Sequence, residues 1–269
     1  MNIRMLEPAA VYQVAPALKP GVVAAAFTPD DGQAEPRRTT AAFAAAAQRH
    51  GAEYFNDSAV DALLQREGRV RGIRVAAHDV LADAVVLATG VWTNTLTRPL
   101  GCEVPIEPRG PQMLLTTPGP RQLGPTLTAV DRALSLKQLP SGEYFIGGGW
   151  PTDIVQGDNG PMCRVRPDSV AGSWAVATEI VPGVADRRVA DSWGGLEAQS
   201  VDGVPFLGPA PGLDGAFLAV GFSGHGFQLS PAVGRALADL VGGARVPELE
   251  PLSSLRTPVP EASHRGTVR

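Results

Sequence analysis

Two short, continuous apolar runs mark the most definite strands of the chain. The first, AVVLA, occupies residues 84–88, and the second, AFLAV, occupies residues 216–220; glycine follows each within two residues. A continuous apolar run that ends in a turn residue is typical of a fully buried strand, and we predict that the first run is buried on both faces. Ahead of it, AVDALLQ and RVRGIRVA flank Glu67 and Gly68 and predict a hairpin.

A different pattern runs from about residue 94 to residue 190. Short strand candidates follow one another there, separated by proline and glycine turns: MLLTT, LTAVD, LSLKQL and EYFIGGG. Short runs of this kind predict strands joined by tight connections. We therefore expect an antiparallel sheet that forms a second domain, interleaved with the segments on either side.

Two helices have recognisable ends. The alanine-rich stretch from Thr40 to His50 predicts a helix that Gly51 closes. A second helix is predicted to begin with Ser230 as N-cap and Pro231 as first residue, and to end at Gly242 and Gly243. Residues 246–269 are rich in proline and polar side chains, which predicts a surface or disordered tail.

The loop GFSGHGFQ, residues 221–228, lies between the second apolar strand and this last helix. Its three glycines permit unusual backbone angles and close approach of another group. The partial positive charge at a helix start favours an anionic or electron-rich group. We interpret the loop as a ligand or cofactor contact. His225 is either a surface loop residue or a group that acts on this ligand.

Composition and charge narrow the function classes. The chain has 269 residues, 44% of them hydrophobic and 19% charged, so it can bury a substantial core in one large or two modest domains. The formal net charge is −4 without a concentrated basic block, which gives no electrostatic support for nucleic-acid binding. The apolar runs are too short for a membrane span and the first residues lack a signal-peptide core, so we expect a cytoplasmic protein. Two cysteines and four scattered histidines predict no metal site.

Several motifs in the same order resemble one family. VVLATGVWTNTL, PRGPQM, SGEYFIGGG and SWGGLEAQSVDGVPFLGPAPGLDGAFLAVGFSGHGFQLSPAVGRALADL are similar to the later part of the FAD-dependent D-amino-acid oxidase superfamily, which includes glycine and sarcosine oxidases. The resemblance covers roughly residues 7–256. It implies an α/β (α+β) fold: an incomplete, Rossmann-like flavin-binding domain of residues 36–93 and 191–245, and an antiparallel-sheet substrate domain of residues 1–35 and 94–190, followed by the 246–269 tail.

The same resemblance assigns FAD contacts to individual residues. It places Val60 at the adenine end of FAD, the turn after the first apolar strand beside the pyrophosphate and ribose, and the 223–228 loop beside the isoalloxazine. His225 is then a candidate catalytic residue at the flavin edge, through a hydrogen bond or positive charge. We expect noncovalent FAD, since neither cysteine lies in these loops. The cofactor candidates are Val60, Ala88, Thr89, Gly90, Trp92, Ser223, Gly224, His225, Gly226, Phe227 and Gln228.

The chain departs from the family at its beginning. Family members start with a strand, a GxGxxG turn and a helix that hold the FAD pyrophosphate, whereas this sequence contains no GxGxxG. We expect either a truncated chain or a second polypeptide that supplies this unit. Apolar strands such as AVVLA would otherwise lack a neighbour.

A second departure concerns the substrate. Glycine oxidases carry an arginine after the WxGL turn that binds the substrate carboxylate, but this chain has Glu197 in SWGGLEA. The motif is more similar to the branch of opine oxidase, D-hydroxyproline dehydrogenase and hydrogen cyanide synthase subunits, which implies a partner electron-transfer subunit. Glu197 is a candidate for the substrate ammonium or for orienting the loop. Trp150 is a candidate pocket wall or a core residue.

These observations predict an FAD-dependent amine or amino-acid dehydrogenase or oxidase, which moves a hydride from the carbon beside the amine of a small-molecule substrate to flavin. The alternative is a non-catalytic relative or assembly subunit that cannot hold FAD alone. A serine hydrolase is disfavoured: GFSGH resembles a nucleophile elbow, but His225 replaces its final glycine and the predicted helix starts too late.

Overall fold

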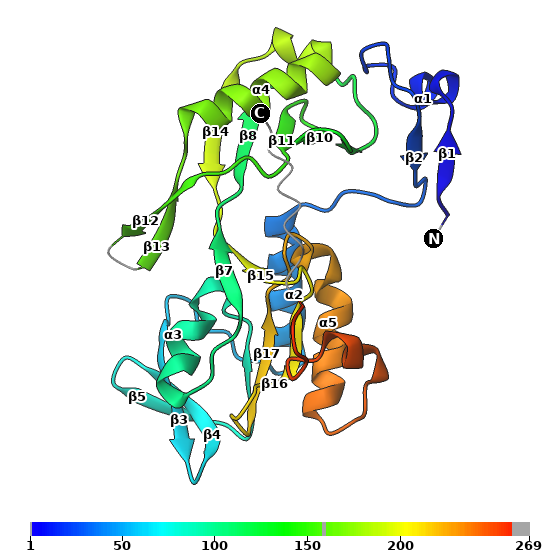
Figure 1. Ribbon diagram of the computed structural model, residues 1–269. Coiled ribbons are helices and arrows are strands. Elements are labelled where there is room, and N and C mark those ends of the chain that lie inside the picture. The colour runs from blue at the N-terminus through cyan, green and yellow to red at the C-terminus, as the bar shows by residue number, and fades with distance from the viewer. Residues whose placement is uncertain (1, 158–159, 260–269) are drawn as a thin grey trace. The chain divides into compact units, whose positions relative to one another are not determined.

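The computed structural model describes residues 2–157 and 160–259, and this part of the chain divides into two compact units. Unit 1 contains residues 2–35 and 110–196, and unit 2 contains residues 36–109 and 197–259. Each unit is therefore assembled from segments that are distant in the sequence. Figure 1 labels the elements.

Unit 1 is built on a five-stranded antiparallel sheet with the strand order β14-β8-β11-β10-β9. The helix α4 lies against β8 and β11 on one face of this sheet (Figure 1). Residues of β8 alternate between buried and half-buried because successive side chains point to opposite faces. The bounds are β8 Gln112–Thr116, β9 Leu127–Thr128, β10 Ser135–Gln138, β11 Tyr144–Gly147, β14 Val189–Gly194 and α4 Pro167–Ile180.

The remaining elements of unit 1 are smaller. An N-terminal helix and two short strands precede the sheet, and a hairpin and a 3-10 helix lie within the second segment. Ala15, after the first helix, is buried in the same core as the sheet and α4, so residues of the N-terminal segment belong to this unit. These elements are β1 Arg4–Leu6, α1 Pro8–Val14, β2 Ala25–Phe27, β12 Asp153–Gly157, β13 Gly160–Arg164 and η3 Pro182–Asp186.

Unit 2 contains three small sheets, with the strand orders β16-β17-β6, β3-β4-β5 and β15-β7. The only parallel pairing among the described strands joins β6 to β17. The bounds are β3 Val60–Arg66, β4 Arg69–Val75, β5 His78–Leu81, β6 Val85–Leu87, β7 Ile106–Arg109, β15 Glu197–Ser200, β16 Phe206–Pro209 and β17 Ala216–Val220. The helices are α2 Pro36–Arg49, η1 Gly90–Trp92, α3 Thr93–Thr97, η2 Arg98–Leu100, α5 Gly226–Val241 and η4 Pro247–Leu252.

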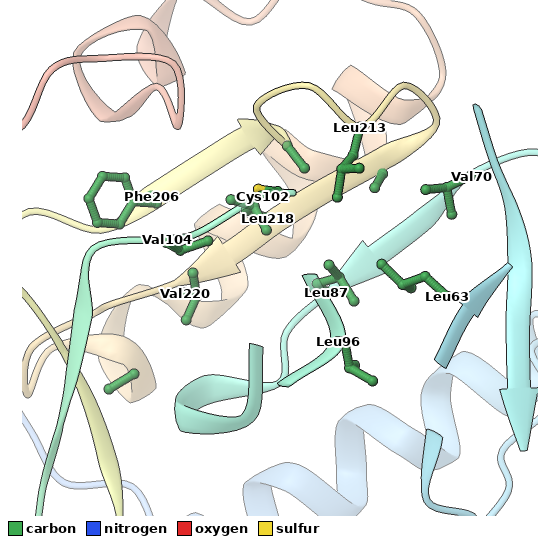
Figure 2. Close-up of a cluster of buried hydrophobic side chains, with 13 residues drawn as sticks. Leu63, Val70, Leu87, Leu96, Cys102, Val104, Phe206, Leu213, Leu218 and Val220 are labelled. Carbon is green, nitrogen blue, oxygen red and sulfur yellow. The ribbon is translucent and has the colours of Figure 1, made fainter. Parts of the chain in front are cut away.

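The main core of unit 2 lies on one face of the β16-β17-β6 sheet. Leu87, Leu218 and Val220 point into it together with Leu63 and Val70 of the β3–β4 hairpin (Figure 2). On the opposite face, Leu207 and Ala219 pack against Leu237 of α5 and Leu249 of η4. Apolar side chains therefore alternate along β16 and β17 between two separate cores, which explains their continuous apolar sequence.

The structure confirms several predicted elements. The hairpin around Glu67 and Gly68 forms, with Arg66 opposite Arg69. All four strand candidates of residues 113–149 join one antiparallel sheet. Gly51 ends α2 with a φ of 91°, a conformation that glycine adopts readily. The helix α4 was not predicted, although Pro167 as first residue and Asp168 in the first turn are signals of a helix start.

The predicted start of the last helix is wrong. The helix α5 begins at Gly226, and Ser230 and Pro231 lie inside it. Proline has no N–H to donate to the carbonyl four residues earlier, which belongs to Phe227. The Ser230 hydroxyl donates to that carbonyl over 2.9 Å and satisfies it. Similarly, α2 begins at Pro36 instead of Thr40, since proline is well suited to a first turn.

The first apolar strand is also less buried than predicted. Leu87 is buried, but the Val86 side chain on the opposite face is 43% exposed. β6 has one hydrogen-bonded neighbour, β17, among residues 2–157 and 160–259. No residue of α2 is buried, and its Phe43 is 54% exposed. Unit 2 therefore carries exposed apolar side chains on both β6 and α2.

The first part of the predicted tail is structured. Leu249 is buried in the core beside α5, and the Arg256 guanidinium lies 4.0 Å above the Phe206 ring. Arg256 also forms an ion pair of 2.9 Å with Asp202, and the two side chains are only 16% and 9% exposed. The ion pair fastens the end of the described chain to the turn before β16. Residues 260–269 of the predicted tail lie outside the described residues.

The division into units falls after Arg109 and after Leu196, whereas the predicted domain limits follow residues 93 and 190. Residues 94–109 stay with unit 2 because Leu96, Cys102 and Val104 pack in its core. The assignment of one unit to flavin and the other to substrate stays a prediction. No helix in the described residues is long and apolar enough to cross a membrane.

Replacing Arg256 by alanine should lower the free energy of unfolding by about 3 kcal/mol, because Asp202 would remain largely buried without its ion partner. Chemical denaturation monitored by tryptophan fluorescence measures this change. Arg245→Ala is the matched control: the Arg245–Glu250 pair is 81% and 62% exposed, so its loss should change stability by less than about 1 kcal/mol. If the two substitutions lowered the free energy of unfolding equally, the result would contradict a stabilising role of the Arg256–Asp202 ion pair.

Candidate functional site

The parallel pairing of β6 with β17 fixes where two predicted cofactor loops begin. Leu87, the last residue of β6, lies opposite Leu218 in β17. Because the strands are parallel, the loops that follow them leave from the same edge of the sheet, which is the one formed by the carboxyl ends of the strands. Residues 88–92 and residues 221–228 therefore both follow the carboxyl ends of neighbouring parallel strands, which is where open α/β sheets bind their ligands.

The first loop turns sharply into a short helix. Gly90 has a φ of 53°, and the Thr89 and Thr93 hydroxyl groups lie 3.0 Å apart. The Thr93 hydroxyl donates to the Gly90 carbonyl over 2.8 Å, which fixes the turn. Ala88 is exposed, and the Trp92 side chain is 45% exposed. The loop thus presents backbone and one aromatic ring to its surroundings.

The second loop contains two consecutive residues with left-handed backbone angles. Ser223 has a φ of 52° and Gly224 a φ of 88°. The Ser223 hydroxyl donates to the Gly221 carbonyl over 3.1 Å and accepts the N–H of Ser200 over 3.1 Å. The Gly224 N–H donates to a carboxylate oxygen of Glu197. Glu197, which is a sequence-based candidate for the substrate ammonium or for orienting this loop, therefore contacts the 221–228 loop directly.

The start of α5 supplies hydrogen-bond donors to this edge. The N–H of Leu229 reaches the His225 carbonyl over 3.3 Å, but the amides of Gly226, Phe227 and Gln228 have no acceptor in the described part of the chain. Amides of a first helical turn have no partner within the helix, and the helix dipole adds partial positive charge there. Because α5 starts five residues earlier than predicted, at Gly226 instead of Pro231, these donors lie directly after Ser223 and Gly224.

His225 is exposed at the N-cap position of α5. The side-chain amide nitrogen of Gln228 lies 3.3 Å from His225 Nδ1. An amide nitrogen can only donate, so Nδ1 is the accepting atom in this contact. Gln228 thereby orients the imidazole. The catalytic role of His225 stays a prediction.

Two predicted residues lie outside this edge. Val60 begins β3, opposite Val75, and its side chain packs against the main core of unit 2. Trp150 belongs to unit 1, where its indole N–H donates to the Ala133 carbonyl over 2.9 Å. Its ring lies so close to α4 that a side-chain carbon on Gly172 would come within 2.3 Å of it. The adenine contact of Val60 and the substrate contact of Trp150 stay predictions.

Neither cysteine lies in the two loops. Cys102 is buried in the core of unit 2, and this burial raises the pKa of its thiol; Cys163 is half-buried in unit 1. The described residues contain no group of three histidine, cysteine or acidic side chains that could hold a metal ion. Sequence reasoning missed one contributor, Ser200, because only the pairing of β15 with the loop reveals its role.

A parallel strand pair with glycine-containing loops at its carboxyl end and a helix start beside them is the arrangement of dinucleotide-binding α/β proteins. Residues 1–240 match the model of the FAD dependent oxidoreductase (DAO) family. The chain therefore belongs to this family. The match confirms the predicted superfamily, its mixed helix and sheet fold, and FAD as the cofactor of the family.

Curated relatives include two kinds of amino-acid oxidoreductase. Glycine oxidase of Pseudomonas aeruginosa is 32% identical over 74% of this chain and 52% of its own length. D-amino acid dehydrogenase of Rhizobium johnstonii is 29% identical over 85% of this chain and 53% of its own length. The chain thus spans about half the length of these relatives.

Solved structures show the same fold. The structure resembles L-proline dehydrogenase from P. horikoshii with a TM-score of 0.85 and 27% identity, over 94% of this chain and 68% of that one. It resembles glycine oxidase from Geobacillus kaustophilus with a TM-score of 0.84 and 25% identity, over 95% and 67% of the two chains.

The open backbone at this edge suits close contact with FAD. A side-chain carbon on Gly224 would meet nothing nearer than Glu197, 3.9 Å away, so the glycine faces open space. The unpaired amides of Gly226, Phe227 and Gln228 would receive an electron-rich group. The residues present therefore fit a flavin edge, and these three would hold it through their backbone.

Replacing Gly226 by valine should weaken FAD binding at least tenfold, since the branched side chain would obstruct approach to the first amides of α5 and press on Phe222, 3.1 Å from the new carbon. The affinity is measured in the fusion with a GxGxxG unit that is described under Proposed function. The protein is titrated with FAD and binding is followed by flavin fluorescence. Gly234→Val is the control in the same helix, where a side chain meets nothing within 4 Å. Unchanged affinity in Gly226→Val would contradict the site.

Proposed function

We propose that this chain supplies the flavin-edge loops and the substrate unit of an FAD-dependent oxidoreductase that oxidises the C–N bond of an amino acid or secondary amine. The observation that carries the proposal is the parallel pairing of β6 with β17, from whose carboxyl ends the 88–92 and 221–228 loops both leave. Family membership supports the cofactor. Relatives named glycine oxidase and D-amino acid dehydrogenase support the substrate class.

In the proposed reaction, the carbon beside the neutral amine loses a hydride and the nitrogen then releases a proton to solvent water. The resulting imine reacts with water to give a carbonyl product and the free amine or ammonia. FAD, when bound, supplies the hydride acceptor. The protein's part is to hold it: the amides at the start of α5 place positive potential at the flavin edge, where the reduced ring gains negative charge.

His225 contributes through its orientation. With Nδ1 occupied by Gln228, the Nε2–H is free to donate toward an electron-rich group at the same edge. We propose that it acts as a donor to the flavin edge. The substrate amine needs only to be neutral and aligned, so the reaction requires no side-chain base at this position.

We further propose that a strand–turn–helix unit outside this sequence completes the flavin domain. Its strand would pair with the open edge of β6, and its helix would cover Val86 and the exposed face of α2 around Phe43. An exposed apolar strand edge is an unfavourable surface in a finished domain. The unit is contributed either by another segment of the same protein or by a partner chain.

A chain extended by a GxGxxG unit should bind FAD. The segment of the glycine oxidase relative that contains this unit, which is itself about 30 residues long, would be fused ahead of Met1, from the first residue of the relative to the point at which its match with this chain begins. We expect the purified fusion to be yellow with noncovalent FAD, whereas the chain alone binds at least tenfold less. Flavin absorption after gel filtration measures the loading. Phe43→Glu in the fusion should reduce loading by disturbing the covered face, and Val23→Glu, which changes an exposed valine of unit 1, should not.

Substrate oxidation is tested on the same FAD-loaded protein. Anaerobic addition of glycine, a D-amino acid or L-proline should bleach the flavin absorption for at least one of them. Lactate is the control because it carries no C–N bond. The exposed apolar side chains of unit 2 also support a second candidate, a non-catalytic assembly subunit. A fusion that stays colourless, or that holds FAD but is bleached by no amine, favours this candidate. The similarity to opine oxidase-type complexes, the partner electron-transfer subunit and the cytoplasmic location stay predictions.

A further inference from the structure

The strand β15 contacts three successive residues of the 221–228 loop, here called the flavin-edge loop. Gln199 forms an antiparallel bridge with Phe222. One residue further along, the Ser200 N–H donates to the Ser223 hydroxyl over 3.1 Å. From the beginning of the strand, the Glu197 carboxylate accepts the Gly224 N–H. The loop is therefore held from one side along its whole left-handed turn.

This turn needs external support. Ser223 has a φ of 52°, a region that non-glycine residues avoid, and Gly224 follows with a φ of 88°. At a non-glycine residue such as Ser223 this angle persists only where surrounding contacts impose it, whereas glycine adopts a positive φ without strain and can equally adopt others. Ser223 is fixed by its own side chain, but Gly224 has no side chain, and its amide is held by Glu197 alone among the described residues.

The contact also determines which amides remain available. Glu197 engages the Gly224 N–H, so the donors that stay unpaired are those of Gly226, Phe227 and Gln228. Without Glu197, the peptide between Ser223 and Gly224 could rotate, because glycine permits many backbone angles. Rotation there would redirect the chain just before α5 and the N-cap residue His225.

We propose that Glu197 is a positioning residue: its side-chain oxygen accepts the Gly224 N–H, fixes the orientation of the peptide between Ser223 and Gly224, and thereby keeps the 221–228 loop in the conformation that binds flavin. The proposal rests on the proposed flavin site. It differs from a contact between Glu197 and a substrate ammonium in one chemical respect. Locking an N–H requires an acceptor oxygen at the right reach, whereas binding an ammonium depends on the negative charge.

Two substitutions separate reach from charge. Glu197→Gln keeps the length and an acceptor oxygen but removes the charge. Glu197→Asp keeps the charge but withdraws the oxygens by one methylene. The matched control is Glu107→Gln on the neighbouring strand β7, where Glu107 is exposed opposite Gln199.

The first measurement needs no flavin. Hydrogen exchange of peptides covering residues 221–226 in the flavin-free protein should be as slow in Glu197→Gln and Glu107→Gln as in the unaltered protein. In Glu197→Asp it should be at least tenfold faster, with little change in melting temperature. Fast exchange in both Glu197 variants, or in neither, would show that the Glu197 oxygen does not hold the Gly224 amide. This conclusion does not depend on which cofactor binds.

The second measurement uses the FAD-loaded fusion. We expect Glu197→Gln to retain FAD affinity and the KM for an oxidised amine, and Glu197→Asp to lose FAD affinity at least fivefold. A Glu197→Gln variant with normal FAD affinity but a tenfold higher KM would overturn the proposal in favour of an ammonium contact. If hydrogen exchange is slow in Glu197→Gln and fast in Glu197→Asp, as expected, but the fusion binds no FAD, the result contradicts the proposed function and still supports the role of Glu197 in holding the Gly224 amide.

Discussion

The parallel pairing of β6 with β17 is the constraint on which the candidate site depends. The two strands are separated by more than a hundred residues, including the whole sheet of unit 1, yet Leu87 and Leu218 lie opposite each other. Their pairing is held by a core shared with the β3–β4 hairpin on one face and by α5 with η4 on the other. Without this pairing the two loops would have no common edge.

The start of α5 gives this edge its chemical character. A helix that began at Pro231 would place its free amides several residues away from the loop. Beginning at Gly226, the helix presents them directly after His225, and the internal proline is accommodated because Ser230 satisfies the Phe227 carbonyl. The strand β15 then fixes the loop from the side. The helix α5 thus positions the donors and the histidine, and β15 positions the loop that precedes them.

Much of this architecture was predictable from local pattern. The β3–β4 hairpin, the strands of the antiparallel sheet and the glycine at the end of α2 follow from residue types that act over a few positions. The family could be inferred because several motifs occur in the same order. The helix start could not, since Ser230 and Pro231 form a good local start signal that a hydroxyl-to-carbonyl bond inside the helix overrides.

The sequence by itself determined the family, the mixed helix and sheet fold and the residue types of the 221–228 loop, because motif order and apolar periodicity are properties of the linear chain. Only the tertiary structure decided the contact of Glu197 with Gly224, the packing of the 247–256 segment and the exposure of Val86. Each of these depends on which distant segments lie against one another. A hydrogen-bond partner or a covered face is set by that packing, and no local pattern records it.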